Sequence, residues 1–325
     1  MAEIVFAFGS SHGPTIATRP EKWDTIVERD KSDPRYDYDE LARNASPSIL
    51  QEITAEKKRQ RWDACQKAIE QLQAMLREAR PDVAVVVSNP HGILPDDTLA
   101  VFGVFRGEML SGPTRNRRER DDDPRVQRYS GPAHHRIERE PKTYKGYPSL
   151  AEHIIASLID AGFDVASTQQ HRAELGVDEA FTCFYRHYQL DGSVAMVPVS
   201  ISRYLPNQAT PRRCFQFGKA LRSAIDSSPE NKRVALMASG GLSHQIMDEE
   251  LDHMVIDALQ SKDFERLRTL PRDRLNLGPG TPETLNWIAV AAAMDPVPMT
   301  LVDYQPCYRS PAGTGHGITF GVWKK

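Results

Sequence analysis

Three histidines in this chain each follow a short apolar run, a placement that favours residues that do chemistry. His12, His91 and His244 come after apolar runs at residues 4–8, 83–87 and 234–238. Each run predicts a buried strand whose carboxyl end is followed by a polar loop. Because ligands and catalytic groups gather at the carboxyl ends of strands in α/β proteins, we expect these histidines to contribute to a site.

A carboxylate at Glu283 could complete a metal site with two of these histidines. Two imidazoles and one carboxylate hold Fe(II) while leaving coordination positions open for other ligands. The chain has ten histidines, which permit many such triplets, and a carboxylate in a first helical turn also complements the helix dipole. Spacing alone therefore leaves an iron site and ordinary structural roles both open.

The elements that must position these residues alternate between strands and helices. Trp62, Cys65, Ile69 and Leu72 are spaced by three or four and predict a helix that Pro81 ends. The pattern predicts an α/β fold with a central, mostly buried β-sheet flanked by helices, in a single catalytic domain over residues 1–325. Further strands are expected at 99–105, 164–168, 194–201, 298–302 and 317–323, and further helices at 148–162, 217–225 and 281–293.

Residues 107–144 are rich in Arg, Asp, Pro and Gly and lack a hydrophobic period, so we expect a long charged loop there. The formal net charge of −3 gives no basic excess, and we expect no nucleic-acid partner. The first residues do not resemble a signal peptide, and no run approaches the roughly 20 apolar residues of a membrane helix. The four scattered cysteines indicate neither a zinc ribbon nor a disulfide framework, and a cytoplasmic location is expected.

Several segments, in order along the chain, resemble the class III extradiol dioxygenases, typified by the protocatechuate 4,5-dioxygenase beta subunit. The likeness runs from residue 4 to about residue 293 and is interrupted by the charged loop. The segment ASGGLSHQ is the most specific. The matching segments are GSSHGP (9–14), VVVSNPH (85–91), KGYPSLAEH (145–153), RCFQFGKAL (213–221), ASGGLSHQ (238–245) and PETLNW (282–287).

The resemblance implies an activity and a set of roles. It places the ligands of Fe(II) at His12, His91 and Glu283, and the catalytic histidine at His244. It implies an aromatic diol as substrate, O₂ as co-substrate and cleavage of the ring bond beside the diol, with His244 as the acid/base. It also implies a homodimer. The tail from Tyr308 to His316 resembles the end of family members that act on methoxylated, lignin-derived aromatics, so catechol-, gallate- and methoxylated rings are all expected substrate classes.

One departure from the family concerns the substrate pocket. Where much of the family has a histidine near the substrate, this chain has Glu179, unless His171 or His187 takes that place. A carboxylate would repel a substrate carboxylate, which disfavours protocatechuate itself.

Substrate contacts are further predicted at Tyr204 and Asn207, which also suit an ordinary turn, and at Ser243, which could orient the ring of His244. Two other functions stay open: a Zn- or Fe-dependent hydrolase or lyase of the same fold, and a non-catalytic binding subunit.

Overall fold

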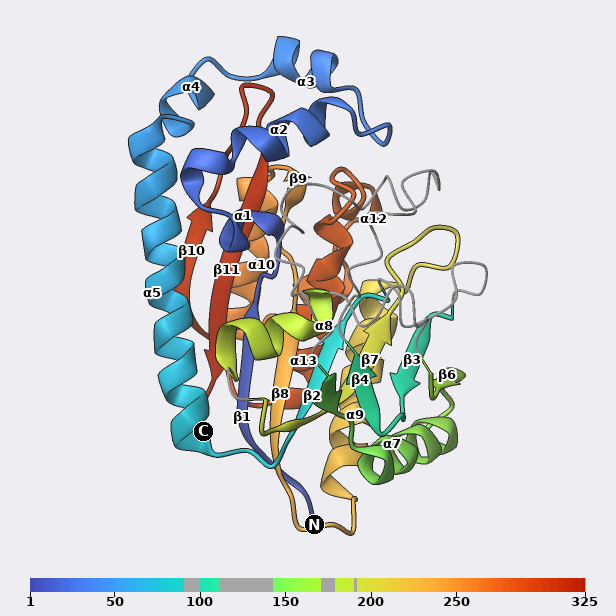
Figure 1. Cartoon of the computed structure of the whole chain (residues 1–325). Coiled ribbons are helices and arrows are strands. Elements are labelled where there is room, and N and C mark those ends of the chain that lie inside the picture. The colour runs from blue at the N-terminus through green and yellow to red at the C-terminus, as the bar shows by residue number, and fades with distance from the viewer. Residues whose placement is uncertain (91–99, 112–142, 171–178, 190–191, 325) are drawn as a thin grey trace.

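A nine-stranded sheet forms the centre of the protein (Figure 1). The computed structural model describes residues 1–90, 100–111, 143–170, 179–189 and 192–324. His91 and the middle of the predicted charged loop lie outside these residues. The strands of the sheet are β1 (Glu3–Ser10), β2 (Val83–Ser88), β3 (Phe102–Phe105), β6 (Val165–Thr168), β7 (Ala195–Ile201), β8 (Arg233–Ser239), β9 (His244–Ile246), β10 (Thr300–Pro306) and β11 (Thr314–Trp323).

Four neighbouring strands run parallel through the middle of the sheet. The strand order is β10-β11-β1-β8-β2-β7-β3-β6, and β9 pairs with β11 off this path. Strand β8 pairs in parallel with β1 and β2, and β2 pairs in parallel with β7. The carboxyl ends of β1, β2, β7 and β8 therefore share one edge of the sheet.

Helices cover both faces of the sheet. Successive side chains of a buried strand point to opposite faces, so they pack into different apolar clusters. Val83, Val85 and Val87 pack into the apolar cluster beneath α7, α9 and α13, whereas Ala84 and Val86 pack into the cluster on the α5 side. The helices are α1 (Pro14–Ala17), α2 (Asp24–Lys31), α3 (Tyr38–Asn44), α4 (Ile49–Glu52), α5 (Ala55–Ala79), α7 (Pro148–Asp160), α8 (Glu179–Cys183), α9 (Pro211–Asp226), α10 (Glu249–Ser261), α11 (Phe264–Arg268), α12 (Arg272–Leu275) and α13 (Thr284–Met294), with short 3₁₀ helices at Pro20–Lys22 and Thr281–Glu283 and a π-helical turn at Phe184–Tyr188.

The predicted fold class, an α/β fold with a central buried sheet, is confirmed. Long helix α5 ends at Ala79, and Arg80, its C-cap just before Pro81, adopts a left-handed φ of 44°. The predictions missed strand β9 and the helices α1–α4, α8 and α10–α12. The predicted loop at 107–144 is also paired at its ends, because β4 (Met109–Ser111) and β5 (Thr143–Lys145) form a two-stranded ladder.

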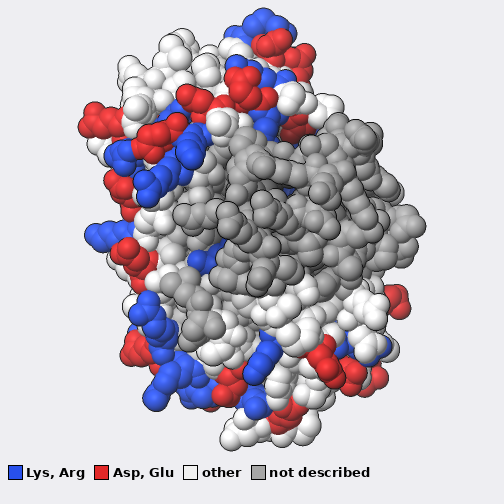
Figure 2. Space-filling view, in the orientation of Figure 1, with Lys and Arg blue, Asp and Glu red and all other residues white. Residues whose placement is uncertain are grey.

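Figure 2 shows Lys and Arg intermixed with Asp and Glu on the part of this face that the structure describes. No single-sign patch stands out among them, in line with the small net charge of −3. None of the helices within the described residues combines the length and apolarity needed to cross a membrane.

A buried ion pair joins α2 to the hairpin that leads into β11. Arg309 donates to both carboxylate oxygens of Asp30, at 2.6 and 2.9 Å, and both side chains are almost fully buried. Thr314 also donates to Asp30, at 2.6 Å, and Arg309 donates to the carbonyl of Gly315 at 3.1 Å. The pair therefore fixes the first residues of β11.

A second buried carboxylate, Asp252 on α10, fixes the turn between β8 and β9. The backbone N–H and the hydroxyl of Ser243 donate to it at 2.7 and 2.6 Å, and the Tyr304 hydroxyl donates at 2.8 Å. Burial raises the pKa of Asp252 to about 7, although these hydrogen bonds oppose the rise.

We predict that Asp30→Asn destabilises the protein by about 3–5 kcal/mol, because it leaves the Arg309 charge buried without its partner. Urea unfolding measures the change. Asp33→Asn is the matched control, because Asp33 pairs with Arg35, whose side chain is 45% exposed; its cost should stay below about 1 kcal/mol. Equal losses in the two variants would contradict a special role for the buried pair.

We also predict a pH signature from Asp252. Its pKa is higher in the folded than in the unfolded state, so the folded state holds the proton more tightly, and stability falls as pH rises from about 4 to about 7. Asp252→Asn should remove this fall, which approaches about 1.4 kcal/mol per pH unit at most. Urea unfolding across this range tests it. Asp257→Asn, on the exposed side of α10, should keep the wild-type pH dependence.

Candidate active site

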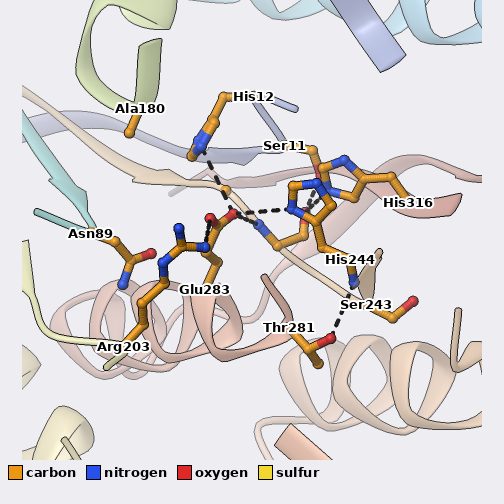
Figure 3. A network of polar contacts seen from close by, with 12 residues as sticks. Ser11, His12, Asn89, Ala180, Arg203, Ser243, His244, Thr281, Glu283 and His316 are labelled. Atoms are coloured by element: carbon orange, nitrogen blue, oxygen red, sulfur yellow. Dashed lines mark hydrogen bonds and ion pairs between the residues drawn. The ribbon is translucent and has the colours of Figure 1, made fainter. Parts of the chain in front are cut away.

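The strand edge holds a cluster of buried polar side chains (Figure 3). His12 follows β1, Arg203 follows β7, and His244 follows the turn after β8. Glu283 enters from the 3₁₀ turn that precedes α13. The structure thus brings together three predicted site residues, His12, His244 and Glu283, from segments far apart in the sequence.

The hydrogen bonds of Ser239 set the tautomer of His12. The Ser239 hydroxyl donates to the carbonyl of Ala180 at 2.5 Å, so its oxygen accepts from His12 Nδ1 at 2.9 Å. Nδ1 of His12 therefore carries a hydrogen, which in the neutral ring leaves the lone pair on Nε2. Metal-binding histidines are commonly held in this way, by a hydrogen bond from the ring nitrogen that does not bind the metal.

Glu283 is fully buried and its charge is balanced by donors. Arg203 Nη1 donates to Oε1 at 2.9 Å, and the backbone N–H of Gly241 donates to Oε2 at 2.9 Å. A Cβ on Gly240, whose φ is +105°, would lie 2.4 Å from Oε2. Only glycine therefore lets the loop close over this carboxylate.

Two imidazoles approach the same oxygen of Glu283. Oε2 lies 3.9 Å from His12 Nε2 and 4.0 Å from His244 Nδ1. Bonds of about 2.0–2.2 Å from a divalent metal to nitrogen and oxygen can span up to roughly 4.2 Å. The lone pair of His12 and the carboxylate of Glu283 thus fit a shared metal ion. Among the described residues, no group of three His, Cys, Asp or Glu side chains is arranged to hold a metal, and the third predicted ligand, His91, lies outside them.

His244 is buried and tightly packed. Its Nδ1 is buried and has no hydrogen-bond partner among the residues that the structure describes, and a Cβ on Gly280 would lie 2.4 Å from that atom. Burial, followed by the nearby His316 and Arg309, lowers the pKa of His244 well below its usual value. A neutral imidazole of this kind can accept a proton.

The other predicted site residues are less central. The hydroxyl of Ser243 points away from the cluster and donates to Asp252, so it does not orient the His244 ring as predicted. Tyr204 is half-buried and accepts a hydrogen bond from Arg203 Nη2 at 3.2 Å. Asn207 lies in the same loop. Glu179 begins α8, next to Ala180, whose carbonyl accepts from Ser239. The substrate contacts of Ser243, Tyr204, Asn207 and Glu179 remain predictions.

Sequence reasoning missed Arg203, Ser239 and His316 as parts of this site. Arg203 lies two residues after the predicted strand 194–201, and Ser239 comes directly after the predicted strand 234–238, so position at a strand exit was the available signal. His316 lies inside β11, and no local pattern marks it as a site residue. Its ring stacks on that of His244 at a centroid distance of 4.0 Å.

A buried amide network supports the exit of β2, two residues before His91. Asn286 donates to Asn89 at 3.1 Å and to the carbonyl of Ser239 at 2.8 Å. Asn89 in turn donates to the carbonyl of Ile201 at 2.7 Å. The network ties the ends of β2, β7 and β8 to α13, which also carries the segment after Glu283.

Comparisons with known proteins identify relatives of this chain. A stretch of 106 residues is 35% identical to a gallate dioxygenase of Pseudomonas putida, covering 32% of this chain and 30% of that protein. The matched stretch therefore spans less than a third of the relative's length. A crystal structure of an uncharacterized protein from Escherichia coli K12 aligns with 18% identity and a TM-score of 0.49, covering 79% of this chain and 92% of that one.

A family comparison covers much more of the chain. The family described as the catalytic LigB subunit of aromatic ring-opening dioxygenase matches residues 45–314. The match includes His244 and Glu283, whereas His12 precedes it. Since it covers most of the sequence, this chain belongs to the family of the catalytic LigB subunit of aromatic ring-opening dioxygenases.

Proposed function

We propose that the protein is an extradiol dioxygenase that opens the ring of an aromatic diol with O₂ and Fe(II). Family membership supports ring-opening chemistry. The observation that carries the proposal is the approach of His12 Nε2, as a lone-pair donor, to within 3.9 Å of Glu283 Oε2. Two imidazoles and a carboxylate suit Fe(II) and leave positions open for a diol and O₂. His91 is the proposed third ligand.

We infer a gallate-like ring as the substrate. One relative is a gallate dioxygenase, and gallate presents three adjacent hydroxyls. Tyr204 and Asn207 follow Arg203 in the loop that leaves β7, so they are proposed to contact ring substituents. We also propose that Glu179 and Ser243 contact the substrate. A homodimer in the cytoplasm completes the proposal.

The proposed reaction divides the work between metal and protein. Ferrous iron, when bound, supplies a site that chelates the diol and activates O₂. His244 accepts a proton from a diol hydroxyl and later returns a proton during ring opening. Arg203 and the Gly241 N–H hold the Glu283 carboxylate in a fixed direction, since each donates to one of its oxygens. The His244 side chain is buried, which limits its contact with bulk solvent.

We predict that His12→Ala and Glu283→Ala lose bound iron, because each removes a proposed ligand. His244→Ala should keep its iron but lower kcat by about 10²–10⁴-fold, the usual contribution of an acid/base group. Metal analysis of the purified variants and steady-state kinetics measure the two effects. His244→Ala is the matched comparison for His12→Ala, since both remove a buried imidazole near Glu283 Oε2. Equal iron loss in all three variants would contradict this division of roles.

We predict that the iron-loaded protein consumes one O₂ per diol and forms a coloured ring-opened product. A panel of gallate, a methoxylated gallate, catechol and protocatechuate, mixed anaerobically and then exposed to air, tests this. Gallate-like rings should turn over faster than catechol and protocatechuate, because they carry a third adjacent oxygen for the proposed contacts with Tyr204 and Asn207. Repulsion by Glu179 should slow gallate and protocatechuate alike, since both carry a ring carboxylate. Turnover that persists without O₂ would instead support a hydrolase or lyase. No turnover of any diol would support a binding subunit.

A further inference from the structure

A second buried imidazole, His316, lies directly against His244. The two residues face each other in the antiparallel pairing of β9 with β11. Residues opposite each other in such a pair carry their side chains on the same side of the ladder. The rings are stacked with centroids 4.0 Å apart and an interplanar angle of 3°. Backbone register therefore places one flat ring over the other.

The packing around His244 leaves its orientation to this stack. Its backbone N–H donates to the Thr281 hydroxyl at 3.1 Å, but its buried Nδ1 has no hydrogen-bond partner within the described part of the chain. Gly280 lies so close that a Cβ there would come within 2.6 Å of Cγ and 2.7 Å of Cβ of His244. The ring of His244 is thus in close contact with the backbone of Gly280 and with the face of His316.

His316 is itself firmly held. The carbonyl of Gly241 lies 3.3 Å from Nε2 of His316, and because a carbonyl only accepts, Nε2 carries the hydrogen. Gly241 is also the residue whose N–H donates to Glu283 Oε2. A Cβ on Gly13 would lie 2.3 Å from His316 Nδ1, so glycine is needed beside the ring. Burial lowers the pKa of His316 to about 3, so the ring is uncharged near neutral pH and does not repel its neighbour by charge.

We propose that His316 is a positioning residue, which holds the imidazole of His244 at the angle needed for proton transfer by face-to-face stacking. The inference rests on the proposed role of His244 as the acid/base. His316 acts through the flat face of its ring, which the pairing of β9 with β11 and the close backbone of Gly13 hold in place. A flat ring without the nitrogens should therefore replace it for this purpose.

The test compares His316→Ala, which removes the stack, with His316→Phe, which keeps a flat ring, and His316→Gln, which keeps polarity without a ring. We expect Ala and Gln to lower kcat about 10²-fold, the scale expected for a misplaced catalytic group, while KM changes less than roughly threefold. Phe should stay within roughly fivefold of the wild-type kcat. His153→Ala, at a half-buried position of α7, controls for removal of a histidine and should match wild type.

A measurement on metal-free protein separates this inference from the proposed function. Diethyl pyrocarbonate acylates accessible imidazole nitrogens, and peptide mass spectrometry follows the reaction at His244, with His253, an exposed histidine of α10, as the reference. We expect slow labelling of His244 in the wild type and in His316→Phe. Labelling should be several-fold faster in His316→Ala and His316→Gln, because the ring is no longer covered.

The outcomes are distinct. If no diol is turned over by the wild type but the labelling pattern holds, the proposed function fails and the stacking role stands. If His316→Phe is as impaired as His316→Ala, the nitrogens matter and the positioning proposal is overturned. Wild-type kcat in a folded His316→Ala also overturns it. If His316→Ala does not fold, as judged by circular dichroism, the contrast between Phe and Gln decides in the same way.

Discussion

The buried carboxylate of Glu283 is the constraint on which the site depends. An ionised carboxylate in a dry interior is costly unless nearby donors and positive charge compensate it. Arg203 and the N–H of Gly241 supply that compensation here, one on each oxygen. They also fix the direction of Oε2, the oxygen that faces His12 and His244. The loop after β8 can supply its N–H only because Gly240 has no side chain.

The parallel strands bring the compensating groups together, because they place several chain segments at one edge of the sheet. The interior of each strand is mostly small or apolar on both faces, and polar residues gather near its ends. His12, Arg203 and the Ser239–His244 turn arrive in this way. The amide network of Asn89 and Asn286 then ties three of the strand ends to α13. The site is therefore built on rigid elements and not on a single loop.

Two further buried carboxylates, Asp30 and Asp252, support the antiparallel side of the sheet. Asp30 with Arg309 holds the start of β11, and Asp252 holds the turn that precedes β9. These two strands carry His316 and His244, so both carboxylates act on the geometry of the stacked pair through the backbone. Neither is adjacent in sequence to the residue that it helps to place. The stability of these supports and the alignment of the imidazoles are thus parts of one structural arrangement.

The sequence by itself determined eight of the nine strands of the sheet, the helices α5, α7, α9 and α13, and the residues at the strand ends, because periodic burial and chain breakers such as Pro81 are local signals. It also carried the family likeness that singled out His12, His244 and Glu283. The tertiary structure decided the tautomer of His12, the pairing of Arg203 with Glu283, and the stacking of His316 on His244. It also turned Ser243 toward Asp252. These features depend on register and packing between distant segments, which no local pattern encodes.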